Sequence, residues 1–234
     1  MSNLQPSLLS RVGAAGLASF FVASIVTGAL NPRYSPMREA ISALAATDAE
    51  FAWIMIAGFM ACAVGLASIG IALWRAFGGN RPARIAAALV TLGGPFMVVA
   101  GLARQDCSER LTSCIDHGEA PNASTHFWVH QFSSLLLFVL MTIALFFLAR
   151  GLRRDRRMSP FAVPTRVAGT FCALVIASMI VNEMTFIDAY AGLAQRAFLL
   201  VLFGWPLVVA AAARTELDER PGSSLSEDVA ADRF

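Results

Sequence analysis

The stretch FWVHQFSSLLLFVLMTIALFFLA, residues 127–149, runs for 23 residues without an Asp, Glu, Lys or Arg. The hydrocarbon core of a bilayer is about 30 Å thick, and a helix needs roughly 20 apolar residues to cross it. A strand of a membrane β-barrel would instead alternate polar and apolar residues over about 10 positions. The stretch therefore predicts a transmembrane α-helix.

Five further uncharged stretches of similar character flank this one. The six predicted spans are residues 12–30, 51–74, 85–103, 127–149, 167–182 and 197–213. A composition that is 57% hydrophobic and only 15% charged agrees with a polytopic membrane protein and excludes a soluble enzyme or a disordered chain. We predict an all-α bundle of six transmembrane helices over residues 12–213, preceded by a short N-terminal segment, 1–11, and followed by a disordered acidic tail, 214–234.

The distribution of arginines predicts how this bundle is oriented. The chain has 18 basic residues, all arginine. With the N-terminus inside, 13 arginines fall on the inner segments and five on the outer loops. Because short cytoplasmic loops carry an excess of positive charge, we predict a cell-membrane protein with both termini in the cytoplasm. The net charge of +2 is too small to indicate a nucleic-acid partner, so the expected partner is the lipid bilayer.

The first outer loop contains a pattern typical of a short amphipathic helix. Ser35 and Pro36 suit a helix cap and first turn. Polar Arg38, Glu39 and Ser42 would lie on one face. The apolar residues of the other face are Met37, Ala40, Ile41, Leu44 and Ala45. We expect this helix to lie at the outer surface of the bundle. Thr47 and Glu50 then have the spacing of a capping box, which predicts that the second span starts there.

Two histidines open the fourth span and provide candidate metal ligands. His126 and His130 are four residues apart, so a helix places them on one face. Asp106 and Glu183 are carboxylates near the same predicted outer boundary, and Arg196 begins the last span there. Since a charge in the bilayer costs about 3 kcal/mol, these groups should face one another or a common pocket. The alternatives are a functional site and a network that only locks helices together.

Cys107 and Cys114 lie in the loop after the third span. The predicted orientation places this loop in an oxidising compartment, where a disulfide between them would be stable. We predict such a bridge, because the six intervening residues exceed the short spacing of most zinc-binding cysteine pairs.

Several of these strings also occur together in one family. They are NPRYSPMREAISALA at residues 31–45, Asp106, the histidines of the fourth span and GLAQR at residues 192–196. In these features the chain resembles the bacterial and archaeal membrane proteins called domain of unknown function 998. The resemblance implies six membrane helices and no established activity. The positions that match are Tyr34, Arg38, Ser42, Asp106, His126 or His130, and Arg196.

Three functions remain open from the sequence. The first is a non-enzymatic protein whose outer pocket binds a polar or anionic ligand, such as a lipid headgroup, through Arg38, Arg196 and the histidines. The second is a zinc-dependent hydrolase or transferase that uses His126, His130 and a carboxylate. The third is a small-molecule transporter. We expect no resident cofactor and no haem, since both membrane histidines share one helix, and zinc stays the alternative.

Overall fold

The computed structural model describes residues 6–107, 123–181 and 190–218. Over these residues it is helical, and six of its helices are long and apolar enough to cross a membrane, as predicted. The long helices are α1 (Pro6–Leu30), α2 (Ala52–Ala76), α3 (Arg81–Leu102), α5 (Thr125–Leu152), α6 (Ala162–Val181) and α7 (Ala191–Asp218). Two short 3-10 helices, η1 (Ile41–Ala45) and η2 (Ser159–Phe161), lie in the connections.

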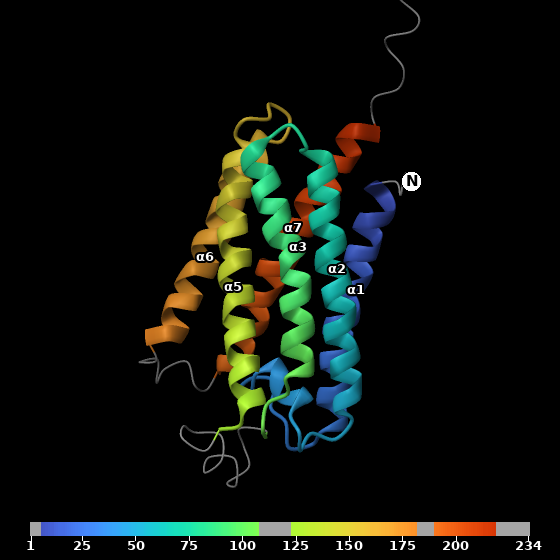
Figure 1. Ribbon diagram of the computed structural model, residues 1–234, viewed down its shortest axis with the longest axis vertical. Helices are drawn as coiled ribbons and strands as arrows, with labels where there is room; N and C mark the ends of the chain where they lie inside the picture. Colours follow the sequence, from blue (N-terminus) through green and yellow to red (C-terminus); the bar gives the residue numbers. More distant parts are fainter. Residues whose placement is uncertain (1–5, 108–122, 182–189, 219–234) are drawn as a thin grey trace, which may run out of the picture.

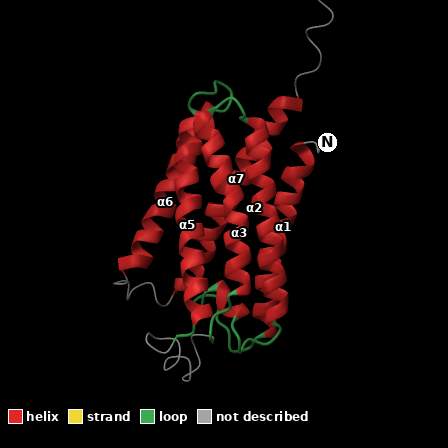
Figure 2. Ribbon diagram, viewed as in Figure 1, coloured by secondary structure: helices red, strands yellow, loops and turns green. Residues whose placement is uncertain are grey.

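The helices run up and down in chain order, and the last one closes the bundle (Figure 1). Helices α1, α2, α3, α5 and α6 each pack against the next, while α7 contacts α1, α2, α5 and α6. The described loops consequently gather at the two ends of the bundle (Figure 2). We call the end that holds residues 31–51 the loop end. We call the opposite end, where α1 starts and α7 stops, the arginine-rich end.

Close contacts between helix backbones hold neighbouring helices together. A Cβ atom placed on Gly16 of α1 would lie 2.8 Å from the Cα atom of Gly65 in α2. A Cβ atom on Gly70 of α2 would lie 2.6 Å from the backbone nitrogen of Thr91 in α3. Lipid provides little hydrophobic drive for helix association, so small residues that allow such close van der Waals packing take over this role.

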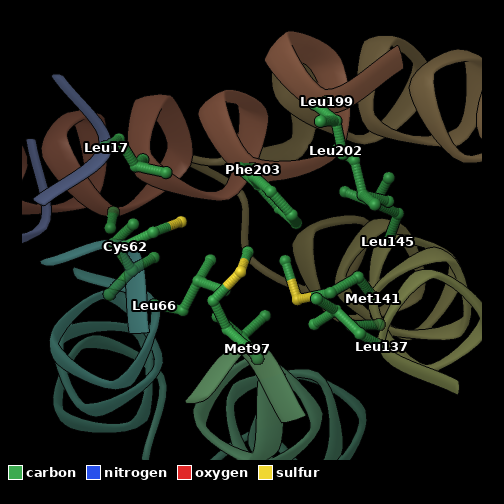
Figure 3. Packing of buried hydrophobic residues seen from close by; sticks show 14 of the residues in the cluster. Leu17, Cys62, Leu66, Met97, Leu137, Met141, Leu145, Leu199, Leu202 and Phe203 are labelled. Atoms are coloured by element: carbon green, nitrogen blue, oxygen red, sulfur yellow. The ribbon is translucent and has the colours of Figure 1, made fainter. Parts of the chain in front are cut away.

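Helix α7 fills the middle of the bundle with aromatic side chains. Phe203 is completely buried, and its ring packs edge-on against Phe20 of α1 with the ring centroids 6.5 Å apart. Phe20 in turn meets Phe59 of α2 at 5.4 Å. In Figure 3 the side chain of Phe203 points into the same space as Met97 of α3 and Met141 of α5. These contacts fix the last helix against helices from the whole length of the chain.

The first loop differs from the predicted amphipathic α-helix. Turns at residues 36–39 are followed by the five-residue helix η1, whose Ile41 and Leu44 are buried. Glu39, expected on a polar outer face, is only 2% exposed. Ala40 has extended backbone angles, φ −62° and ψ 151°, which break any continuous helix. The cause is tertiary, because backbone groups here bond to side chains of other segments, as described below.

The predicted capping box is also absent from the start of α2. The helix begins at Ala52, after Phe51, whose φ of 56° is left-handed, and no side chain caps it. The backbone N–H of Thr47 donates to the carbonyl of Gln105 at 2.9 Å, and its hydroxyl donates to the carbonyl of Asp106. Thr47 therefore joins the first loop to the end of α3 and is not available to cap α2.

Candidate functional site

At the loop end, Arg196 of α7 clamps the first loop. Its Nη1 donates to the backbone carbonyls of Pro36 at 2.7 Å and Glu39 at 3.1 Å, and to Gly192 one turn earlier at 2.8 Å. Its Nη2 donates to the hydroxyl of Tyr34, and the guanidinium lies 5.6 Å from the centre of that ring. A planar group with five donors suits such a set of fixed acceptors. Most of the Arg196 hydrogen bonds are thus made to oxygen atoms of the protein's own first loop.

The start of α7 also fits the loop at the level of the backbone. A Cβ atom on Gly192 would lie 2.4 Å from the carbonyl oxygen of Glu39, so only glycine leaves room for this approach. The N–H of Leu193 donates to the carbonyl of Met37 at 3.2 Å. The side-chain Oε1 of Gln195 accepts from the N–H of Ile41 at 2.8 Å. These bonds replace the helical ones that residues 36–41 would otherwise make.

Glu39 and Tyr34 complete the loop from within. The Oε1 atom of Glu39 accepts from the backbone N–H of Ser35 at 2.7 Å. The hydroxyl of Tyr34 lies 3.3 Å from the carbonyl oxygen of Glu39 and 3.2 Å from that of Ala40, and it donates to them. We call Tyr34, Glu39, Gln195 and Arg196 the loop clamp. Because its bonds satisfy buried backbone groups, the loop holds one shape beside the membrane.

A second cluster joins the end of α3 to the start of α5. Asp106 accepts from the backbone N–H of Ser124 at 2.8 Å and from its hydroxyl. Ser124 also caps α5 by accepting from the N–H of Phe127. The Nδ1 atom of His126 lies 2.8 Å from the carbonyl oxygen of Arg104 and 3.3 Å from Oδ1 of Asp106. Here a carboxylate, a serine and an imidazole hold the ends of two helices together.

Arg104 connects this second cluster to the first loop. Its Nε donates to the carbonyl of Ala45 at 2.8 Å, and its Nη2 donates to that of Ala46. The last two carbonyls of the η1 region thereby gain donors that the helix itself does not supply. Arg104 is not among the site residues predicted from the sequence, although it directly precedes Gln105 and Asp106.

Between the loop clamp and the centre of the bundle lies a cavity of about 420 Å³. This volume falls in the range of small-molecule sites. Its polar lining residues are Ser42, Gln105, His130, Gln131, Ser134 and Gln195. Its apolar lining residues are Phe20, Ala40, Ile41, Phe59, Met97, Ala100, Leu135, Leu137, Phe138, Met179, Leu199 and Phe203.

The polar and apolar linings occupy different depths. Along α5 the lining passes from His130 through Ser134 to Phe138, and along α7 it passes from Gln195 to Phe203. Eight residues of helix span about 12 Å, so the cavity is polar near the loop end and apolar toward the bundle centre. This gradient matches a ligand with a polar head and an apolar body.

Gln105 places a buried hydrogen-bond acceptor without a described partner in the wall of the cavity. Its side chain is 7% exposed, and its Oε1 atom has no hydrogen-bond partner among the described residues. A buried acceptor without a partner costs about 1–3 kcal/mol. His130, by contrast, is partnered: its Nδ1 donates to the carbonyl of Ala100 at 2.7 Å. A bound donor at the cavity's polar end would remove the penalty at Gln105.

The structure distributes the predicted site residues over three places. Ser42 and His130 line the cavity, Tyr34, Glu39 and Arg196 form the loop clamp, and Asp106 and His126 form the second cluster. Arg38 has an exposed side chain and lines no part of the cavity. Glu183 and Cys114 lie outside the described residues, so the roles predicted for Glu183 and the Cys107–Cys114 bridge stay predictions.

The metal alternative finds no complete ligand set in residues 6–107, 123–181 and 190–218. These ranges contain no group of three or more His, Cys, Asp or Glu side chains placed to hold a metal ion. His126 and Asp106 are close together, but His130 bonds to α3 a turn deeper. A zinc site here would therefore need at least one ligand from outside the described residues.

A known family profile matches most of the chain. The profile of the family described as protein of unknown function (DUF998) matches residues 14–212. The chain belongs to this family. A search of curated proteins and a search of solved structures gave no match. The DUF998 match covers four of the long helices completely and most of α1 and α7, together with both clusters and the cavity, so these features lie inside the family domain.

Sequence reasoning missed four polar residues of this DUF998 cavity, namely Gln105, Gln131, Ser134 and Gln195. Two of them could have been selected from their positions in the sequence. Ser134 follows His130 by one helical turn in an otherwise apolar span, and Gln195 directly precedes Arg196 in the quoted GLAQR string. Gln105 could not have been selected in this way, because its burial depends on how the end of α3 meets the first loop.

Proposed function

We propose that this chain is a membrane protein that binds a lipid or lipid-like molecule with an uncharged polar head group in the cavity at the loop end. Six polar side chains that donate or accept hydrogen bonds surround the head, and aromatic and aliphatic side chains surround the body. The observation that carries the proposal is the unpartnered Oε1 atom of the buried Gln105 in the cavity wall.

An uncharged head group fits the described lining better than the anion considered from sequence. The described cavity wall contains no arginine. Arg196 donates to three carbonyls and to Tyr34, and Arg38 is exposed. Amides and hydroxyls remain, and they recognise hydroxyl or amide groups through paired donors and acceptors.

We further propose binding and not catalysis as the role of the cavity. The Asp106–His126 pair does not line it, and the imidazole of His130 is tied to the backbone of α3. A general base must lie within hydrogen-bond reach of the proton that it removes, and the Asp106–His126 pair lies outside the cavity lining. On the arginine distribution, the loop end faces the outside of the cell and the cavity takes its ligand from the outer leaflet or the exterior.

The test compares two probes that share one acyl chain. Purified protein in detergent is titrated with 1-monooleoylglycerol, which has a neutral dihydroxyl head, and with oleate, which has a carboxylate. Binding is followed by thermal unfolding and by native mass spectrometry. We expect monooleoylglycerol to raise the melting temperature more than oleate. Stronger binding of oleate that is lost in Arg38→Gln would contradict the neutral head group, and binding of neither probe would contradict a lipid site.

Gln105→Met provides the decisive variant, because it should raise the stability of the empty protein and lower its affinity for monooleoylglycerol. Removing the unpartnered amide oxygen should stabilise the empty protein by about 1–3 kcal/mol. The same change should weaken monooleoylglycerol binding, since the head group loses a partner. Ser68→Ala is the matched control: its hydroxyl is buried and bonds to Val64 in its own helix, outside the cavity. It should leave probe binding unchanged.

A further inference from the structure

A second hollow lies at the arginine-rich end, between α5 and α6. This groove has a volume of about 800 Å³ and is separate from the loop-end cavity. Three arginines, Arg150, Arg153 and Arg166, line it together with Ser159. The remaining lining residues are Phe146, Phe147, Ala149, Ala162 and Val163. No carboxylate is among them.

The antiparallel register of the two helices brings the arginines to a similar depth. A Cβ atom on Gly169 of α6 would lie 3.4 Å from the ring of Phe146 in α5, which sets these two residues level with each other. Moving one turn toward the arginine-rich end reaches Arg166 on α6 and Arg150 on α5. Arg153 follows one turn later at the end of α5. The contact between Phe146 and Gly169 thus bounds the groove on the side toward the bundle centre. The three arginines lie at its mouth, on the side toward the arginine-rich end.

The cations at the mouth have no partner in the described part of the chain. Arg150, Arg153 and Arg166 are exposed, and none of them forms an ion pair or side-chain hydrogen bond there. Asp155, the nearest acid in sequence, instead accepts from the backbone N–H groups of Arg157 and Met158. A phosphate group is the common membrane anion that guanidinium groups bind in pairs of hydrogen bonds.

The apolar lining indicates which kind of phosphate compound fits. Phe146 and Val163 are 39% and 61% exposed, so aromatic and aliphatic surface lies beside the arginines where the helices face lipid. We propose that this groove is a binding site for an anionic phospholipid. Its phosphate lies between the three arginines, and its acyl chains lie against Phe146 and Val163. Basic pockets between helices on the cytoplasmic side of a membrane suit such head groups.

The test counts lipids that stay bound to the protein. The chain is reconstituted with mixtures of phosphatidylglycerol and phosphatidylcholine, and retained lipid is measured by native mass spectrometry. The groove variant is Arg150→Gln/Arg153→Gln/Arg166→Gln. The matched control is Arg154→Gln/Arg156→Gln/Arg157→Gln, which removes the same charge from exposed residues of the same end that do not line the groove.

We expect the wild type and the control to retain phosphatidylglycerol in preference to phosphatidylcholine, and the groove variant to lose the preference. About 1 kcal/mol per arginine corresponds to roughly fivefold in affinity for each residue removed. An equal loss in both triple variants would mean diffuse surface attraction and would overturn the proposal. So would competition by millimolar inorganic phosphate, which would indicate a site for free anions. Failure of monooleoylglycerol binding at the loop end would leave this groove unaffected.

Discussion

A single side chain, Arg196, holds together segments that are about 160 positions apart in the sequence. It contacts Tyr34, Pro36 and Glu39 in the first loop and Gly192 in its own helix. Arginine was expected here as a partner for an anion or for Glu183. Among the described residues its partners are instead neutral oxygens, most of them in the backbone. The residue type was visible in the sequence, but the acceptors depend on the shape of a distant loop.

Replacing Arg196 with Leu should therefore destabilise the protein. Several oxygens would lose a charged donor, and hydrogen bonds to charged groups contribute about 1.5–3 kcal/mol. Since the guanidinium is half-buried, we expect a loss near 2 kcal/mol and a lower melting temperature in detergent. Arg38→Leu is the control with the same charge change at an exposed position, and it should stay within about 0.5 kcal/mol. Equal melting temperatures for the two variants would show that the hydrogen bonds of Arg196 do not stabilise the protein.

The cysteines give a second prediction at the scale of residues. Cys62 and Cys172 are free and buried, whereas Cys107 and Cys114 are predicted to form a bridge outside the membrane. In denaturant without reductant, an alkylating reagent should label two thiols per chain, and after reduction it should label four. Labelling of four thiols before reduction would refute the bridge. Cys107→Ser should leave the melting of the bundle nearly unchanged, since each helix satisfies its own backbone.

At the scale of elements, the contact between α7 and the first loop depends on the absence of one side chain. Gly192→Ala would place a methyl group 2.4 Å from the oxygen of Glu39 and 2.6 Å from that of Pro36. Both obstacles are backbone atoms, so the helix or the loop must move. We expect a loss of about 1–3 kcal/mol, comparable to overpacking a core, and weaker protection of residues 36–41 from hydrogen exchange.

Gly204 offers a control in the same helix. A Cβ atom there would have no atom within 4 Å, so Gly204→Ala should be neutral or should stabilise α7 by up to about 1 kcal/mol. A destabilised Gly204→Ala protein, or a Gly192→Ala protein with wild-type melting, would contradict this account of α7.

The long helices could be predicted from the sequence, and the first loop could not. Lipid exposure imposes a composition on every span, so apolar runs identified all six. The loop obeys no such rule. Its 35–45 pattern is compatible with an amphipathic helix, but Gln195 and Arg196 supply the partners that favour a turn and a 3-10 helix instead. Local periodicity contains no information about those long-range partners.

At the scale of the whole molecule, orientation is the main prediction. α1 starts and α7 stops at the same end as the connection from α5 to α6, and the connection from α1 to α2 lies at the opposite end (Figure 1). Arg154 belongs to the first of these connections and Arg38 to the second. We expect a cysteine at position 154 to react with an impermeant reagent only after the membrane is opened, and a cysteine at position 38 to react in intact cells. Native thiols are replaced first. The reverse labelling pattern would show that both termini lie outside, contrary to the prediction from the arginine distribution. The phospholipid groove would then lie in the outer leaflet.

During synthesis, the cavity can form only after the loop-clamp residues of α7 have been translated, because Gln195 belongs to both. The clamp residues Gln195 and Arg196 leave the ribosome about 160 residues after their partners in the first loop, which at 5–20 residues per second is about 8–32 s. Until then, the carbonyls of Pro36 and Glu39 lack the charged donor that Arg196 supplies, and the N–H of Ile41 lacks its acceptor on Gln195. A chain that stops after Val181 should thus leave this loop open to protease. The order of synthesis thus makes the fold of the first loop depend on a helix that is translated last among the six spans.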